Sequence, residues 1–242
     1  MRSRVLWKTP GPQPNGLQAG PDGIWVIDQV DNRVYKLDPD GGGVLHSFPT
    51  RAKHSSGITL DPWGGVWVAS TFGFDIIRYD PFTGAELSSI PTPGDPTVGA
   101  HGLEWRDGAL WINVPKTATL YQVDPRDGRV LQQVPAPGSR PHGMAWVDGY
   151  QAGGGWGARA RVSALSDEPG VATNAPPIWC VETDRRAIVL LDPTTGRELS
   201  EIPVEGPEPH GMTILDGVFW LCEASTREVF VVEVPSVGTA PS

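Results

Sequence analysis

The sequence predicts an all-β fold, a closed five-bladed β-propeller with four-stranded blades, and two observations carry this prediction. One frame of short strands and turns recurs five times along the 242 residues. The strand that the last copy lacks is found at the start of the chain. Repeats of about 40 to 50 residues with four strands each are typical of propeller blades.

The third copy shows the frame most plainly. It opens with His101-Gly102-Leu103-Glu104-Trp105 and turns at Asp107-Gly108 into a second strand around Trp111. Two more strand-like segments follow, at 120–124 and 130–135, separated by Asp127-Gly128. Asp-Gly pairs favour tight turns because glycine adopts positive φ at little cost. The copy therefore reads as four short antiparallel strands.

The other copies repeat this frame. Each begins with a polar residue before a glycine, and the pairs are Asn15-Gly16, Ser56-Gly57, His101-Gly102, His142-Gly143 and His210-Gly211. Each second strand contains a tryptophan that we expect in the core, at positions 25, 67, 111, 179 and 220. The first three intervals between the glycines are 41, 45 and 41 residues, and the fourth is 68.

The long fourth interval predicts an insertion at about 151–177 within a single domain of residues 1–242. It interrupts the turn between the first two strands of blade four, on the bottom face. We expect a flexible loop, a plug under the channel or a contact between copies of a homo-oligomer. A monomer is the alternative, and a catalytic role is not expected on this face.

The fifth copy predicts how the ring closes. It ends after the strand-like segment 229–235, with no fourth strand. Arg4-Val5-Leu6-Trp7-Lys8-Thr9-Pro10 resembles the fourth strands at 129–135 and 197–203. Pairing of this N-terminal segment with the last blade would close the ring and cover the exposed strand edge.

Composition excludes several classes of partner. The net charge is −9, so there is no basic excess to neutralise the phosphates of nucleic acid or of an anionic membrane. No apolar run is long enough to cross a bilayer. The first residues lack the apolar core of a signal peptide, so we expect a cytoplasmic protein. Cys180 and Cys222 are expected to be buried and reduced.

The polar groups of the repeats are predicted to meet at the top of the channel. In each blade the first strand starts at this face and the second strand returns to it. The residues before the repeat glycines include three of the five histidines, His101, His142 and His210. The residues three positions after the second-strand tryptophans are Asp28, Ser70, Val114, Glu182 and Glu223.

Three imidazoles beside carboxylates form a donor set for a divalent transition metal such as Zn, Fe, Mn, Ni or Cu. We predict His101, His142, His210 and Glu223 as ligands. Glu223, Glu182 or His142 is the expected catalytic group that removes a proton. The alternative is that the Pro-His-Gly turns are structural, because repeats also duplicate residues that have no function.

Other residues near the same mouth are expected to bind substrate. Aromatic and cationic groups around a small mouth favour an apolar, anionic small molecule. Phe72 and Phe74 stand out because exposed aromatic side chains in a loop need a partner. The full set of predicted substrate-binding residues is Asn15, Asp28, Ser56, Phe72, Phe74 and Arg186.

These repeats resemble those of streptogramin B (virginiamycin B) lyase and the wider NHL and SMP-30-like propellers. The resemblance rests on Pro-His-Gly-Met at 141–144 and 209–212 and Ala-His-Gly-Leu at 100–103. It implies a divalent cation held by carboxylates, which match Glu182 and Glu223, and a histidine base. The similar peptidyl-hydroxyglycine lyases hold zinc with three histidines. Those families have seven and six blades, whereas plant-type glutaminyl cyclases have five but share no further motif with this chain.

The sequence therefore predicts a metal-dependent enzyme that acts on a small organic molecule at the top of the channel. The resemblance favours a lyase that acts by elimination or ring opening. A metal-dependent hydrolase or lactonase is one alternative. A non-catalytic NHL-type module that binds a protein or a ligand is another.

Overall fold

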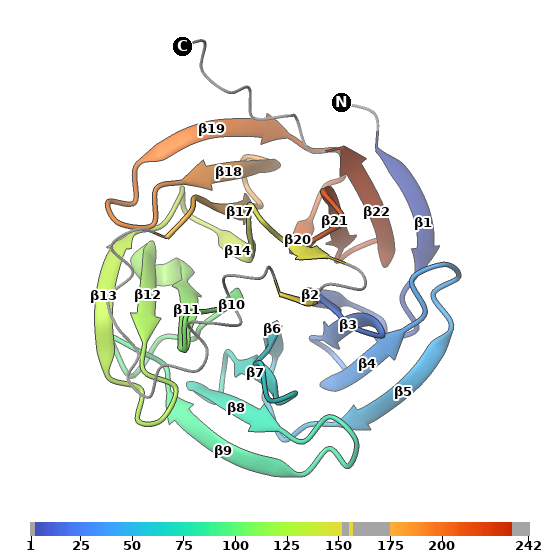
Figure 1. The fold of residues 1–242 in the computed structure, drawn as a ribbon, viewed down its shortest axis with the longest axis horizontal. Coiled ribbons are helices and arrows are strands. Elements are labelled where there is room, and N and C mark those ends of the chain that lie inside the picture. Colours follow the sequence, from blue (N-terminus) through green and yellow to red (C-terminus); the bar gives the residue numbers. More distant parts are fainter. Residues whose placement is uncertain (1–2, 152–154, 157–174, 234–242) are drawn as a thin grey trace.

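Five four-stranded blades surround one axis in the computed structural model, which describes residues 3–151, 155–156 and 175–233 (Figure 1). Blade one contains β2 (Pro14–Gly20), β3 (Gly23–Asp28), β4 (Arg33–Leu37) and β5 (Val44–Pro49). Blade two contains β6 (Ser55–Leu60), β7 (Val66–Ser70), β8 (Asp75–Tyr79) and β9 (Glu86–Pro91). Blade three contains β10 (Leu103–Arg106), β11 (Ala109–Val114), β12 (Thr119–Val123) and β13 (Val130–Pro135), with a 3-10 turn at Pro115–Thr117.

The last two blades depart from this plain order. Blade four contains β14 (Pro141–Trp146), β17 (Ile178–Glu182), β18 (Ala187–Leu191) and β19 (Glu198–Pro203). Blade five contains β20 (Pro209–Leu215), β21 (Val218–Glu223), β22 (Glu228–Glu233) and, outermost, β1 (Arg4–Lys8). Successive strands within each blade are antiparallel.

The N-terminal strand closes the ring as the sequence predicts. β1 pairs with β22 in antiparallel register, with Arg4 opposite Val231 and Lys8 opposite Glu228. The Trp7 side chain is 9% exposed and packs on Trp220 with ring centroids 6.4 Å apart. The edge of β22 is therefore covered by the opposite end of the chain (Figure 1).

The second-strand tryptophans hold neighbouring blades together. Trp67 stacks on Trp105 of the next blade at 6.4 Å, and Trp111 meets Trp146 edge-on at 5.2 Å. Of the five second-strand tryptophans, four are buried, and Trp220 is half-buried beside β1. Apolar surface between blades is thus removed from water all round the ring, which is the main stabilising contribution of the fold.

The repeat glycines lie where the inner strands converge. A Cβ atom on Gly102 would lie 1.8 Å from the carbonyl oxygen of His142, and one on Gly57 would lie 1.9 Å from that of His101. Only glycine permits this approach, which explains the recurring glycine. The space left between the strands here is about 10 Å³, close to the smallest that holds one water molecule.

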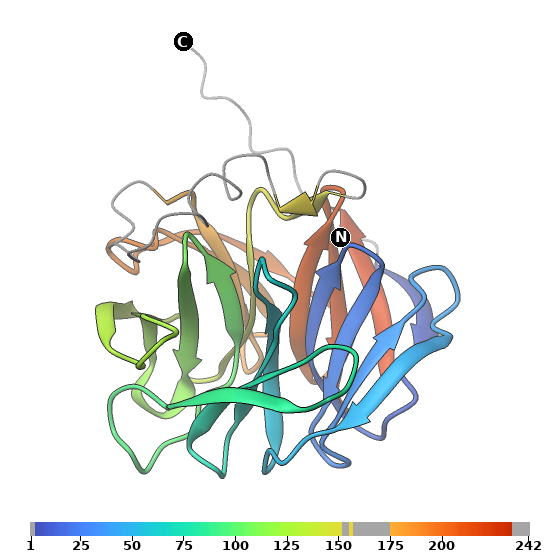
Figure 2. The ribbon, with the colours of Figure 1, turned by 60° about the horizontal axis from the view of Figure 1, so that its bottom comes forward.

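The insertion leaves blade four between β14 and β17. Two short strands within it, β15 (Tyr150–Gln151) and β16 (Gly155–Trp156), pair with each other, and Tyr150 pairs with Leu215 of β20. Leu215 is the bottom end of β20, so these strands lie on the face opposite the histidines (Figure 2). Residues 152–154 and 157–174 lie outside the described residues, and an oligomer contact through the insertion stays a prediction.

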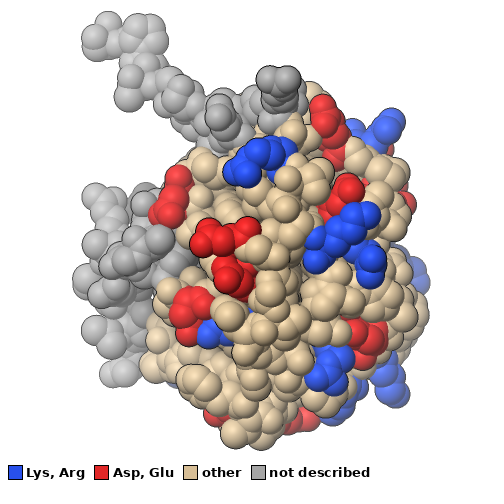
Figure 3. All heavy atoms as spheres, turned by 90° about the vertical axis from the view of Figure 1, so that its right-hand side faces the viewer, with Lys and Arg blue, Asp and Glu red and all other residues tan. Residues whose placement is uncertain are grey.

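The composition also led to predictions about surface charge, membrane-spanning segments and the two cysteines. Acidic and basic side chains are interspersed over the face seen in Figure 3. In the part of the chain that the structure describes, no helix is long and apolar enough to span a membrane. Cys180 and Cys222 are buried and free, as predicted.

Candidate active site at the top of the channel

A cavity of about 580 Å³ opens at the top mouth of the channel. All five blades contribute to its wall. The residues that line it are Pro12, Gln13, Asn15, Gln29, His54, His101, Pro115, Arg140, His142, Glu208, His210, Ala224 and Ser225. The ring of repeat glycines lies below, so the site is a bowl and not an open pore.

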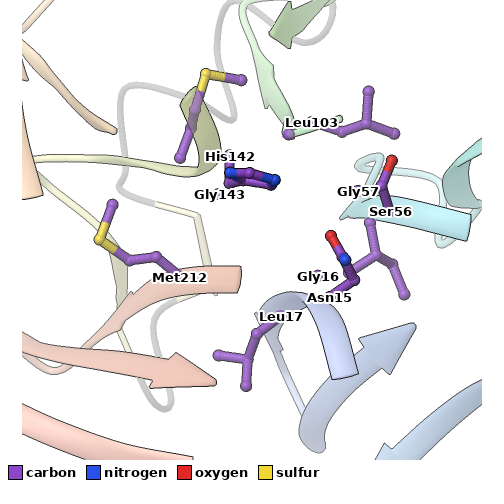
Figure 4. A pocket seen from close by; sticks show the side chains of 12 residues that line it. Asn15, Gly16, Leu17, Ser56, Gly57, Leu103, His142, Gly143 and Met212 are labelled. Atoms are coloured by element: carbon purple, nitrogen blue, oxygen red, sulfur yellow. The ribbon is translucent and has the colours of Figure 1, made fainter. Parts of the chain in front are cut away.

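The three histidines of the repeat column lie side by side in this bowl. The His101 and His142 ring centroids are 4.7 Å apart, and those of His142 and His210 are 4.2 Å apart. Asn15 and Ser56 occupy the same position in blades one and two, and Figure 4 shows their side chains with His142 around the axis. The regular spacing of the repeat is what brings these distant residues together.

Backbone carbonyl groups fix the tautomers of two of these histidines. Nδ1 of His142 lies 2.9 Å from the carbonyl oxygen of Arg140, and Nδ1 of His210 lies 2.8 Å from that of Glu208. A carbonyl can only accept a hydrogen bond, so each Nδ1 must carry the proton. Nε2, at the far end of each ring, is then the nitrogen with a free lone pair.

Thr183 adds a second partner to His142. Its Oγ1 donates to the carbonyl oxygen of Pro209 at 2.6 Å, so it is free to accept from Nδ1 of His142 at 2.8 Å. These two hydrogen bonds of Thr183 connect the inner strands of blades four and five and hold the plane of the His142 ring in one orientation. Thr183 directly follows Glu182 in the sequence, and the repeat frame alone did not single it out.

Burial keeps the three imidazoles neutral. It lowers the pKa of His101 to about 3 and the pKa of His142 well below its usual value, and the neighbouring histidines lower both further. The pKa of His210 is also lowered by burial, but the carbonyl and the carboxylate of Glu208 oppose this change. At neutral pH all three rings are therefore bases without charge, and His210 is better supported than His142 for taking up a proton.

The second-strand carboxylates hold the loops that carry these carbonyl groups. Glu182 accepts hydrogen bonds from the backbone N–H groups of Ser139 at 3.0 Å, Arg140 at 2.7 Å and Arg185 at 2.6 Å. Glu223 likewise accepts from the N–H of Glu208 at 2.6 Å. Each carboxylate thus fixes the residue whose carbonyl oxygen binds the next imidazole.

Asp28 repeats this arrangement in blade one. Its carboxylate accepts from the backbone N–H of Gln13 at 2.6 Å and from that of Val30 at 2.9 Å. These bonds favour a loop-holding role for Asp28, Glu182 and Glu223. The substrate-binding role expected of Asp28 and the ligand or catalytic roles expected of the two glutamates stay predictions.

Blade three shows what happens without the carboxylate. Val114 occupies its position, and Nδ1 of His101 is buried with no hydrogen-bond partner among the described residues. His101 is held through its backbone instead of its ring: its backbone N–H donates a hydrogen bond to the carbonyl oxygen of Asn113 at 2.8 Å. An oriented histidine and a carboxylate therefore occur together in blades four and five and are both missing from blade three.

A glycine completes the motif that sequence reasoning missed. Gly11, Gly138 and Gly206 each precede the column residue by four positions, and a Cβ on any of them would lie within 3.0 Å of Asp28, Glu182 or Glu223. The shared pattern is Gly-x-x-Pro followed by His or Asn and then Gly, at 11–16, 138–143 and 206–211. This pattern was readable in the sequence.

The donor set was tested for a metal ion. Within the described residues, no group of three or more His, Cys, Asp or Glu side chains is arranged to hold one. The carboxylates are bound to backbone N–H groups, and the Nδ1 atoms of His142 and His210 are bound to carbonyl groups. Metal-bound histidines commonly make the same bond from their second ring nitrogen, so of these contacts only those of the carboxylates oppose the predicted metal centre, and metal dependence stays a prediction.

The other predicted substrate-binding residues are placed in different ways. Asn15 lines the cavity, whereas Ser56 lies just below it and donates to the carbonyl oxygen of Ala100 at 2.9 Å. Phe72 is 59% exposed and stacks on His54 at 4.2 Å, so it borders the cavity through that ring. Phe74 and Arg186 are not among the lining residues. Their roles stay predictions.

Gln29 and His54 are lining residues that the repeat frame did not single out. Gln29 accepts from Asn15 and Gln13 and contacts Nε2 of His54. His54 has a positive φ of 58° and is part-buried under Phe72. Burial lowers its pKa. Gln29 directly follows Asp28, one position past the residues that the frame singled out, whereas His54 lies in a loop outside the repeated positions.

Comparison with known proteins shows likeness in structure alone. No protein-family model matches the chain, and no curated protein matches it. The glutaminyl cyclase of Myxococcus xanthus has a TM-score of 0.70 at 11% identity, covering 96% of this chain and 95% of that one. Virginiamycin B lyase of Staphylococcus aureus has a TM-score of 0.55 at 16% identity, and the match covers 97% of this chain and 99% of that one.

A third similar structure is regucalcin of Agrobacterium tumefaciens, with a TM-score of 0.58 at 16% identity, covering 96% of this chain and 94% of that one. Such low identities establish the fold and not the activity. The resemblance stated from the sequence is confirmed at the level of the fold: the chain is a β-propeller, the fold of the virginiamycin B lyase, regucalcin and glutaminyl cyclase structures, and its own ring has five blades.

Proposed function

We propose that this chain is an enzyme that removes a proton from a small organic substrate held in the histidine bowl. The observation that carries the proposal is the pair of neutral, oriented imidazoles, His142 and His210, with their Nε2 lone pairs free in a cavity of substrate size. Solved structures of similar fold include a lyase and a cyclase, which supports an enzyme.

Elimination with ring opening or loss of a leaving group is the proposed reaction class. Nε2 of His210 takes a proton from a carbon of the substrate, and the electron pair of the broken C–H bond forms a double bond as the leaving group departs. The imidazolium that results is stabilised by the Glu208 carbonyl oxygen at 2.8 Å and its carboxylate at 3.8 Å from Nδ1. The proton then passes to the leaving group or to solvent.

Hydrolysis is the second candidate, because the same Nε2 would activate a water molecule in a cavity open to solvent. A metal-dependent version of either reaction is also a prediction, although no group of three or more ligand side chains among the described residues is arranged around an ion position. Regucalcin, one of the similar structures, is described as calcium-binding.

The test is a screen of lyase and lactone or ester hydrolase substrates with wild type and the His210→Ala and His142→Ala variants. We expect kcat/KM to fall at least about a hundredfold in His210→Ala, the loss typical of a general base. His46→Ala is the matched control, because His46 lies on β5 at the outside of blade one, and it should keep full activity.

Elemental analysis of untagged protein belongs to the same experiment. Stoichiometric metal that is lost in His142→Ala would establish the three-histidine metal site in place of the metal-free base. Ligand binding that survives in both cavity variants, without turnover, but falls when Phe72 and Phe74 are replaced would place the function at the rim. It would then favour the NHL-type binding module.

A further inference from the structure

The floor of the bowl presents hydrogen-bond acceptors without donors. Asn15 is 3% exposed and gives Nδ2 to Gln29, which leaves its Oδ1 buried with no partner among the described residues. Nε2 of His142 and Nε2 of His210 are lone-pair nitrogens because Nδ1 carries the proton. A buried acceptor that lacks a donor is unfavourable, so a ligand that donates here gains a hydrogen bond.

The arginine that lines the bowl and two arginines of the neighbouring loops are paired with carboxylates. Arg140 is the one cation among the described lining residues, and it pairs with Asp184 at 3.0 Å and Glu208 at 3.1 Å. Arg51 and Arg185 in the neighbouring loops each pair with two carboxylates. The anionic substrate expected from the sequence therefore finds no unpaired cation among the described lining residues of the bowl.

The charged groups behind the wall of the bowl are carboxylates. The carboxyl groups of Asp28, Glu182 and Glu223 lie beneath the loops that form the wall and are bound to backbone N–H groups. Burial holds the imidazoles neutral, so they do not repel a positive group. The bowl is lined by hydrogen-bond acceptors, and the carboxylates behind its wall have no ion pair among the described residues. Such a bowl attracts a cation that donates hydrogen bonds.

We propose that the substrate carries a primary ammonium group, which Asn15 and His142 bind on the floor. This inference names the substrate class of the proposed active site and rests on that proposed function. An ammonium has three N–H donors and no acceptor, which complements Oδ1 of Asn15 and Nε2 of His142. Figure 4 shows these two side chains around the axis. His210 is then left as the base, and Pro12, Pro115 and Ala224 offer apolar contact to the rest of the molecule.

The experiment is direct titration of the wild-type protein at pH 7 by calorimetry and NMR with three probes of similar shape. These are 2-phenylethylammonium, 2-phenylethanol and 3-phenylpropanoate, which present a cation, a neutral hydroxyl and an anion. We expect the ammonium to bind at least about tenfold more tightly than the other two. Equal binding, tighter binding of the carboxylate or no binding of the ammonium would overturn the proposal.

Variants at Asn15 test the position of the group. Asn15→Asp adds a carboxylate and should tighten ammonium binding about tenfold, whereas Asn15→Ala should weaken it about as much. His46→Ala should change nothing. If a variant at Asn15 fails to fold, the selectivity of the wild type among the three probes still decides. An ammonium that binds as well to Asn15→Ala as to wild type would exclude this floor as its site.

The outcomes separate this proposal from the proposed function. Turnover of substrates that lack an amine, lost in His210→Ala, would sustain the enzyme and refute the ammonium class. Selective ammonium binding with no turnover in the screen would sustain the ligand class and refute the enzyme.

Discussion

At the residue scale, each oriented histidine depends on a buried carboxylate that it does not touch. Glu182 binds the N–H of Arg140, and the carbonyl oxygen of Arg140 binds Nδ1 of His142. Glu223, Glu208 and His210 repeat the arrangement. Charge-assisted bonds from backbone N–H groups are strong, so the carboxylate is an effective anchor for a loop. The sequence placed carboxylates and histidines at one mouth, but spacing alone does not show that a strand end would bind backbone instead of substrate.

Replacement of Glu182 tests this anchoring role. Glu182→Gln loses one acceptor oxygen and places an NH₂ group against backbone N–H donors. We expect the free energy of unfolding to fall by about 1–3 kcal/mol, measured by urea denaturation. Asp40→Asn, at an exposed turn, should cost less than about 0.5 kcal/mol. A variant as stable as wild type would show that Glu182 does not anchor the loop.

Glu104 offers a test by pH at a buried group. It lies on β10, is 2% exposed, and its Oε2 has no partner among the described residues. Burial raises the pKa of this carboxyl group well above its usual value. Between the unfolded and the folded pKa the folded state keeps a proton that the unfolded state has lost, so stability falls as the pH rises through this window.

Glu104→Gln removes this titration. We expect its Tm to exceed that of wild type at pH 7 and to differ little at pH 4, where the wild-type carboxyl group is protonated in both states. Glu205→Gln, at an exposed position, is the control and should show no such dependence. The same difference in Tm at both pH values would mean that Glu104 is not a buried neutral acid.

At the scale of the elements, the inner strands are set by the glycine that opens each repeat. The sequence predicted the strands, the tryptophans and the order of the blades, because these follow from a repeated local pattern. It also predicted that the histidines would converge. It did not predict that the glycines would nearly close the channel, because that depends on how closely five inner strands approach one another.

Gly102→Ala tests this packing. The added Cβ would lie 1.8 Å from the carbonyl oxygen of His142, so blades three and four would have to move apart. We expect a loss of at least about 2 kcal/mol in the free energy of unfolding. Gly41→Ala is the matched control, because a Cβ there has no atom within 4 Å, and it should be close to neutral. Equal effects of the two changes would refute the close approach.

At the scale of the whole molecule, stability depends on closing the ring with β1. Trp7 lies on this strand and is 9% exposed, whereas Trp63 at a turn of blade two is 64% exposed. We expect Trp7→Ala to cost about 3–5 kcal/mol in calorimetric unfolding and Trp63→Ala about 1 kcal/mol. A Trp7→Ala protein as stable as Trp63→Ala would mean that the N-terminal strand does not hold the ring closed.

The sequence predicted the propeller because the strand frame is repeated along the chain. It did not predict contacts that form only when the loops are folded. Five frames and a displaced strand defined the propeller, since closure leaves a unique place for β1. Gln29, one position past Asp28, and His54, in the loop before β6, were not predicted as lining residues. The pairing of Arg140 and its neighbours with acids is likewise a property of the folded surface, and it supports the ammonium ligand that we propose in place of an anion.

The central claim is that His142 and His210 are neutral bases with their protons on Nδ1. The most direct measurement is the imidazole nitrogen NMR spectrum of protein labelled with ¹⁵N-histidine, recorded in EDTA from pH 8 to pH 5 and assigned with His142→Gln and His210→Gln. We predict the Nδ1–H tautomer for both residues at pH 7 and protonation only below the usual pKa of about 6.5. A proton on Nε2, or titration of either ring at or above 6.5, would contradict the claim.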